Sequence, residues 1–301
     1  MNRLFLALLL ILVLPIIADT CRFTDQGVYT SPDELIKKSQ GLWKKIFFGV
    51  DKPRRSFHQP SSVASANNMI AVADMAAGKV WLAGDKKHPV SLSPPEGFGS
   101  PVDLVFGKDE LFVSDSSEKR VWSYNLKSKR WKEIVHVFVR PTGLFYSADR
   151  ETLLIADTGA HAIYTFQSEK ICSLISEGLN FPTDVVAGGD EIYIADAMDH
   201  QIEVWSWEGK RIRVFGESGN KHGYFAFMRG LALDRTNERL FVSDVHMNWI
   251  QVFDRMGKLL FVYGGEGVLH HPSYINYIDK TLWLADSFSG RVLKLGVSCA
   301  N

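Results

Sequence analysis

The chain has 301 residues, of which 46% are hydrophobic, and its 34 basic and 34 acidic side chains give a formal net charge of zero at pH 7. A chain of this length can bury a large core. Zero net charge argues against nucleic acid as a partner, because a nucleic-acid-binding face needs excess Lys and Arg to replace the counterions of the phosphates.

Residues 1–18 have the pattern of a signal peptide. A short positive start at Arg3 precedes the apolar run FLALLLILVLPII, which is short for crossing about 30 Å of hydrocarbon and typical of a secretory leader. We expect cleavage after Ala18 and an extracytoplasmic location: periplasmic, secreted or membrane-anchored as a lipoprotein. In the lipoprotein alternative a lipid anchor at Cys21 is the only membrane contact.

Residues 19–42 form an extension before the main domain. Within it, Ser31 and Glu34 match a capping box, which predicts a short helix over residues 32–41. The segment WKKIFFG at 43–49 then begins a single domain that runs to residue 301.

A short apolar strand ending in aspartate occurs six times in that domain. The six aspartates are Asp74, Asp115, Asp157, Asp196, Asp244 and Asp286, and their spacings are 41, 42, 39, 48 and 42 residues. A period of roughly 40 residues built from strands is typical of radial or solenoid repeats. The strands that end in these aspartates are apolar on both faces, so they need neighbours above and below. We predict an all-β, six-bladed β-propeller with four-stranded antiparallel blades.

The last repeat ends at Val297, directly after its third strand, so its edge strand is missing. Residues 43–49 resemble the edge strands of the other repeats. Because a propeller leaves no open edge, we predict that this N-terminal segment completes the last blade and closes the ring.

Three cysteines are present, Cys21, Cys172 and Cys299. Cys21 and Cys299 lie at the two ends of the mature chain, which are neighbours in a closed ring, and an exported protein meets an oxidising compartment. We predict a Cys21–Cys299 disulfide, unless Cys21 carries lipid. Cys172 is expected to be a buried, small apolar residue.

The repeats resemble the NHL repeat, and the clearest copy is FPTDVVAGGDEIYIADAMDHQIEVWSWEGKRIRVFGESG from Phe181. The resemblance covers residues 43–297 and is greatest to exported bacterial NHL-repeat proteins; it implies a six-bladed propeller. His161 and His200 match the family's His four residues after the aspartate. The other repeats depart from the pattern there, with Gly78, Lys119, Asn248 and Gly290.

The six repeated aspartates are interpreted as structural turn caps, because a carboxylate at the same place in every blade can accept backbone N–H bonds. A catalytic residue would occur once.

Four other residues are candidates for a metal site. His161 and His200 occupy equivalent places in adjacent repeats, and metal-bound histidines occur in NHL-like lyases. Asp103 and Asp184 follow the entry prolines by two residues and are expected at the mouth of the central channel, where carboxylates suit calcium. Histidines bonded within turns and acids lining a wet channel are the alternative interpretations.

These patterns favour a monomeric, non-enzymatic scaffold that binds a protein partner or a ligand through loops on a rigid ring. No cofactor is expected in that case. The alternative is a metal-dependent lyase or hydrolase that uses calcium or zinc at the central channel.

Overall fold

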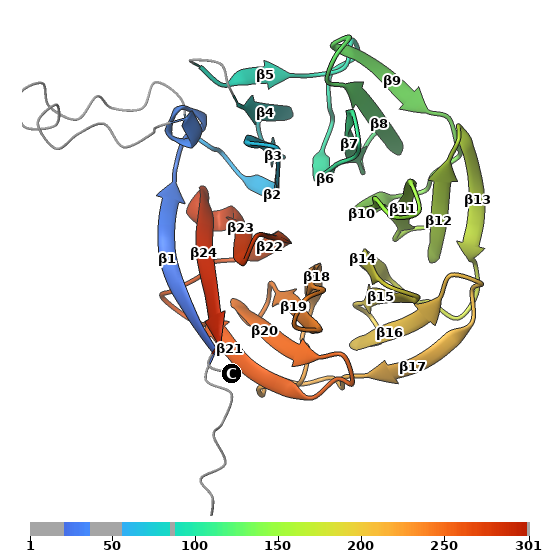
Figure 1. Ribbon diagram of the computed structural model, residues 1–301, viewed down its shortest axis with the longest axis vertical. Coiled ribbons are helices and arrows are strands. Elements are labelled where there is room, and N and C mark those ends of the chain that lie inside the picture. Colours follow the sequence, from blue (N-terminus) through green and yellow to red (C-terminus); the bar gives the residue numbers. More distant parts are fainter. Residues whose placement is uncertain (1–20, 37–55, 85–87, 300–301) are drawn as a thin grey trace, which may run out of the picture.

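The computed structural model describes residues 21–36, 56–84 and 88–299. Six four-stranded sheets stand radially around a central axis (Figure 1). The predicted all-β, six-bladed propeller is confirmed. We number the blades one to six in the chain order of their inner strands.

Within each of the first five blades the strands run from the axis outward in chain order. Blade one comprises β2 (Pro60–Ala66), β3 (Met69–Asp74), β4 (Lys79–Ala83) and β5 (Val90–Leu92). Blade two comprises β6 (Pro101–Phe106), β7 (Glu110–Asp115), β8 (Arg120–Asn125) and β9 (Arg130–Ile134). Blade three comprises β10 (Pro141–Ser147), β11 (Thr152–Asp157), β12 (Ala162–Gln167) and β13 (Lys170–Ile175). Blade four comprises β14 (Pro182–Gly188), β15 (Glu191–Asp196), β16 (Gln201–Ser206) and β17 (Arg211–Phe215). Blade five comprises β18 (Met228–Asp234), β19 (Arg239–Asp244), β20 (Trp249–Asp254) and β21 (Leu259–Gly264).

Blade six combines the two ends of the chain. It contains β22 (Pro272–Ile278), β23 (Thr281–Asp286), β24 (Arg291–Cys299) and, as its outer strand, β1 (Cys21–Tyr29). Figure 1 shows β1, in blue, running beside the red β24. The antiparallel register places Cys21 opposite Cys299 and Tyr29 opposite Val292.

The prediction of which segment closes the ring is therefore wrong. The place beside β24 is taken by residues 21–29 and not by residues 43–49, which lie outside the described residues. β1 suits the place because its nine residues match the nine of β24. It also packs Phe23 against blade five, with ring centroids 4.7 Å from Tyr263 and 5.3 Å from Phe261.

Helical structure is sparse in the described residues. Two short 3-10 helices occur, η1 (Pro32–Ile36) and η2 (Ser287–Ser289). The expected helix over 32–41 thus shows a 3-10 turn in its first half, and residues 37–41 lie outside the described residues. The Glu34 carboxylate accepts the backbone N–H of Thr30 at 2.6 Å. Nowhere in the described ranges is a helix long and apolar enough to cross a membrane.

The core lies between adjacent blades. Every residue of the second strands β11, β19 and β23 is buried, as strands covered on both faces require. The outer strands are covered on one face only. Cys172 lies on the outer strand β13 and is exposed, so the expectation that it is buried is wrong.

A buried hydroxyl joins each blade to the inner strand of the next one. Each Ser or Thr donates to a backbone carbonyl of the following blade, at distances between 2.5 and 3.1 Å. The six pairs are Ser61–Pro101, Ser114–Thr142, Thr158–Pro182, Thr183–Met228, Ser243–Ser273 and Ser287–Pro60. These bonds fix the inner strands, which carry the candidate site.

Candidate functional site

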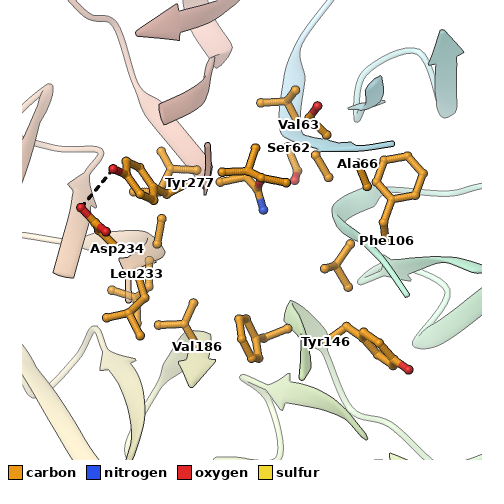
Figure 2. Close-up of a pocket in the computed structure, with 18 of the residues that line it drawn as sticks. Ser62, Val63, Ala66, Phe106, Tyr146, Val186, Leu233, Asp234 and Tyr277 are labelled. Carbon is orange, nitrogen blue, oxygen red and sulfur yellow. Dashed lines mark hydrogen bonds between the residues drawn. The ribbon is translucent and has the colours of Figure 1, made fainter. Parts of the chain in front are cut away.

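The inner strands surround a cavity of about 600 Å³ on the axis of the ring. It is lined by the third and later residues of these strands and by the turns that follow β18 and β22. The cavity therefore opens on the face that carries those turns. Figure 2 shows Val63, Phe106, Val186 and Leu233 converging on it from four different blades.

The floor of the cavity carries two buried carboxyl groups, Asp103 and Asp184, with exposed fractions of 5% and 3%. Asp103 accepts the Ser62 hydroxyl at 2.6 Å and the backbone N–H groups of Leu104 and Leu144 at 2.8 and 2.7 Å. Since Ser62, Asp103 and Leu144 belong to three successive blades, this side chain bridges blades one to three.

Asp184 repeats the arrangement between blades four and five. Its carboxylate accepts the backbone N–H groups of Val185 at 2.8 Å and of Leu231 at 2.7 Å. Both carboxyl groups keep lone pairs that these bonds do not use, because a carboxylate accepts about four hydrogen bonds. The floor can therefore accept a further donor from a ligand.

Burial raises the pKa of both groups. Removal from water raises the pKa of Asp103 to about 7, against the lowering effect of its hydrogen bonds from Ser62, Leu144 and Leu104. Burial, followed by the negative charge of Asp103, raises the pKa of Asp184 well above its ordinary value. The two acids are thus near enough to interact, and burial favours the protonated form of both.

The inner strands approach so closely at this level that two blades need glycine. A Cβ at Gly143 would lie 2.5 Å from the Cα of Asp184, and one at Gly230 would lie 2.8 Å from the Cα of Tyr274. Tyr274 is itself fully buried and donates its hydroxyl to the Thr183 carbonyl at 3.1 Å. Its ring fills the axis beside the floor, since the hydroxyl reaches from blade six to blade four.

The rim carries polar pairs and the cations Arg235 and Lys280. The Tyr277 hydroxyl donates to the Asp234 carboxylate at 3.0 Å, as Figure 2 shows. The Arg235 guanidinium lies 5.6 Å from the centre of the Phe145 ring and donates to the Ala187 carbonyl at 3.1 Å. The cavity thus combines apolar walls with hydrogen-bonding groups at its floor and mouth.

The six repeated aspartates lie at the opposite end of the blades and are all fully buried. Five of them accept two successive backbone N–H groups from the segment that leads into the inner strand of the same blade. Asp157, for example, accepts those of Val139 and Arg140 at 2.8 and 2.7 Å. The other four, Asp74, Asp115, Asp196 and Asp244, accept the backbone N–H groups of the following pairs, in that order: His58 and Gln59, Gly99 and Ser100, Asn180 and Phe181, and Ala226 and Phe227. In blade six Asp286 accepts the His270 N–H and the Arg291 guanidinium, each at 2.7 Å.

His161 and His200 lie in the β11–β12 and β15–β16 turns, whereas Asp103 and Asp184 lie on inner strands. Both histidines have a positive φ, and so do the residues at that place in the other four blades: Gly78, Lys119, Asn248 and Gly290. A left-handed residue at this point of the turn is therefore what all six repeats share, and His and Asn tolerate it better than most side chains. His161 also contacts the Asn180 carbonyl through Nδ1.

The donor set does not fit a metal ion. Across residues 21–36, 56–84 and 88–299, no group of three or more His, Cys, Asp or Glu side chains is placed to hold one. The four candidates do not form one site, and calcium or zinc chemistry has no geometric support in this region.

Sequence reasoning reached Asp103 and Asp184 from their spacing after the entry prolines. It missed the apolar walls, Ser62 as a hydrogen-bond partner and the hydroxyls that join the blades. The recurrence of Ser or Thr directly after the entry proline, as in Ser61 and Thr183, was the signal for some of those hydroxyls.

No model of a known protein family matches the chain. Two curated proteins match parts of it. Protein SUPPRESSOR OF QUENCHING 1, chloroplastic, of Arabidopsis thaliana is 27% identical over 208 residues, covering 52% of this chain and 20% of that protein. Protein brain tumor of Drosophila melanogaster is 26% identical over 137 residues, covering 42% of this chain. The chain spans only 20% and 12% of the lengths of these relatives.

Solved structures resemble the whole ring. A protein of unknown function from Bacteroides thetaiotaomicron has a TM-score of 0.68 at 14% identity, covering 93% of this chain and 77% of its own. Virginiamycin B lyase from Staphylococcus aureus has a TM-score of 0.64 at 11% identity, covering 92% and 99%. A chain of the nidogen/laminin complex has a TM-score of 0.63 at 15% identity, covering 77% and 88%. At these identities the likeness shows the fold alone, which is a β-propeller.

Proposed function

We propose that this protein is an exported, non-enzymatic NHL-repeat propeller that binds a small ligand in its central cavity. The observation that carries the proposal is the cavity itself, about 600 Å³ of space enclosed by six strands. Small-molecule sites in proteins are concave, mostly apolar and roughly 300–1,000 Å³ in volume. The cavity has that size, and six joined blades hold it rigid.

The chemistry of the lining indicates the class of ligand. Val63, Phe106 and Val186 offer apolar contact, and the floor offers the free lone pairs of Asp103 and Asp184. The favoured ligand has an apolar body and an N–H or O–H donor that reaches the floor. No described group supports the alternative of a metal-dependent lyase or hydrolase.

Export is proposed from the leader-like pattern of residues 1–18, and the NHL type from the repeat motif. The proposal of export is supported by the register that places Cys21 opposite Cys299, because an oxidising compartment would allow them to pair. Docking of a protein partner on the loops remains a prediction.

The test uses N-phenyl-1-naphthylamine, an apolar amine that fluoresces when it leaves water. We expect saturable binding by the purified protein and at least a tenfold weaker affinity for Ala66→Trp, because Ala66 lines the cavity and the larger ring occupies it. Val137→Trp is the matched control, since Val137 is 89% exposed and lies outside the cavity lining. Equal affinity for Ala66→Trp and the parent, with both folded by circular dichroism, would refute the cavity as the binding site.

A further inference from the structure

On the face opposite the cavity mouth, the six blades have different side chains at equivalent positions. We call this the entry face, because the segments leading into the inner strands and the turns after the repeated aspartates meet there through the aspartate hydrogen bonds. Two residues after the aspartate, blades one to three have Ala76, Ser117 and Gly159. Blades four to six have Met198, His246 and Phe288.

The residue before each inner strand shows a similar change. It is Gln59, Ser100 and Arg140 in blades one to three, and Phe181, Phe227 and His271 in blades four to six. Because blades one to three form the same fold without these large rings, folding does not require them. At these two positions, large apolar and imidazole side chains thus occur in blades four to six only.

These rings contact one another and remain partly open to solvent. Phe227 lies 6.1 Å from Phe181 and 5.2 Å from His246 between ring centroids. His271 stacks on Phe288 at 4.2 Å with an angle of 6° between the planes. Phe288 is 55% exposed, so its ring is accessible to a ligand.

Cations accompany the rings. Arg229 is the second residue of β18, where the other blades have Ser61, Val102, Thr142, Thr183 and Ser273. Its guanidinium lies 5.9 Å from the centre of the Phe227 ring, and its side chain hydrogen-bonds to the buried Tyr274 hydroxyl. Its buried Nε has no hydrogen-bond partner among the described residues. Arg140 stands in the same way over Phe181, at 5.9 Å.

The acids nearby bond to groups other than Arg229. The Asp244 and Asp286 carboxylates are buried and occupied, the first by backbone N–H groups and the second by the His270 N–H and Arg291. Glu266 lines an adjoining recess of about 800 Å³ together with His246 and His270. Burial and the charges of Arg229, His246 and His270 lower the pKa of His271 to about 4, which leaves its ring neutral and flat against Phe288 at pH 7.

We propose that the entry face of blades four to six binds a carboxylate carried on a flat aromatic group, with Arg229 as the donor to the carboxylate and Phe227 and Phe288 as contacts for the ring. A cationic ligand is disfavoured by Arg229, and no three metal-binding side chains of the described region come together here. Charge-assisted hydrogen bonds from Arg and contact with exposed aromatic rings are the interactions that such a ligand needs.

The test compares 2-naphthoate with 2-naphthamide, which has the same ring system without the charge. Binding is followed by NMR shifts of the imidazole C–H signals, which report on His246, His270 and His271 directly. We expect 2-naphthoate to shift these signals and to bind at least tenfold more tightly than 2-naphthamide. Arg229→Gln should weaken 2-naphthoate binding at least tenfold and leave 2-naphthamide unchanged.

Arg150→Gln is the control for loss of charge, because Arg150 follows the inner strand β10 on the cavity side and lies over Trp207 at 4.6 Å. Phe288→Ala, at an exposed position, is the second variant and should weaken 2-naphthoate binding at least threefold. Ala66→Trp should have no effect, which separates this site from the cavity. Equal binding of both compounds, unshifted imidazole signals, or full affinity in both the Arg229→Gln and Phe288→Ala variants would overturn the proposal.

Discussion

Aspartate has two different roles in this ring, although every one of the residues concerned is buried. The repeated aspartates join each blade's second strand to the segment that enters the blade, and they occur in all six blades. Asp103 and Asp184 join one blade to the next and occur in two blades only. The difference lies in their position on the inner strands, at the floor of a cavity, where burial and mutual repulsion favour the protonated form.

The floor acids predict a pH dependence of stability. The Asp103 carboxyl has an ordinary pKa of 3.8, which we take for the unfolded chain, and about 7 in the fold. Between these pH values the folded protein holds a proton that the unfolded chain has lost. The contribution of Asp103 to the free energy of unfolding is therefore complete below about pH 4 and falls as the pH rises to about 7.

Asp103→Asn should make the decline of the free energy of unfolding between pH 4.5 and 7.5 shallower, because the amide does not ionise. Urea unfolding at several pH values measures this slope. Asp190→Asn is the control, since Asp190 is 97% exposed and should keep the parent slope. A variant with the full parent slope would mean that Asp103 titrates in the fold near its ordinary value.

At the scale of the element, β1 shows where a repeat pattern stops being informative. The strands inside each blade could be predicted because the second strand is apolar on both faces and ends in aspartate. An outer strand has one exposed face, so its pattern is weak: β1 reads Arg22, Phe23, Thr24, Asp25, and most of it is exposed. Residues 43–49 are more apolar and were the better match by sequence. The outer strand is instead set by pairing between residues more than 260 positions apart, which depends on the length of β1 and on the contacts of the Phe23 ring.

Phe23→Ala should lower the free energy of unfolding by about 2 kcal/mol, below the usual cost of a fully buried Phe because the ring is only partly buried. The loss should be global and cooperative, since β1 joins the first and last parts of the chain. Val28→Ala on the same strand is the control, because Val28 is 44% exposed. Urea unfolding measures both variants, and equal small losses would mean that β1 contributes little to ring closure.

At the scale of the molecule, sequence reasoning predicts what the blades share and fails where they differ. The blade number, the strand order and the positions of the repeated aspartates follow from the period, because each repeat must satisfy the same packing and backbone bonds. The match of His161 and His200 to the NHL pattern does not by itself indicate a metal site. The residues at this turn position are left-handed in all six blades, which explains the two histidines without a metal. The cavity and the aromatic half of the entry face depend on which side chains the ring brings together across blades, and spacing along the chain does not encode that.

Closure of the ring gives the last prediction. The register of β1 with β24 places Cys21 opposite Cys299, which is the backbone arrangement that the predicted disulfide needs. A crosslink between residues 21 and 299 would restrict the unfolded state strongly, by about 5 kcal/mol in the chain-entropy account. The intact mass under non-reducing conditions should be lower than that of the reduced protein by two hydrogen atoms, and Cys299→Ser should lower the free energy of unfolding. Cys172→Ser should change neither the mass difference on reduction nor the free energy of unfolding, because Cys172 is exposed on an outer strand. A mass that reduction does not alter would refute the disulfide, and a large mass increase located at Cys21 would indicate the lipid-anchored alternative.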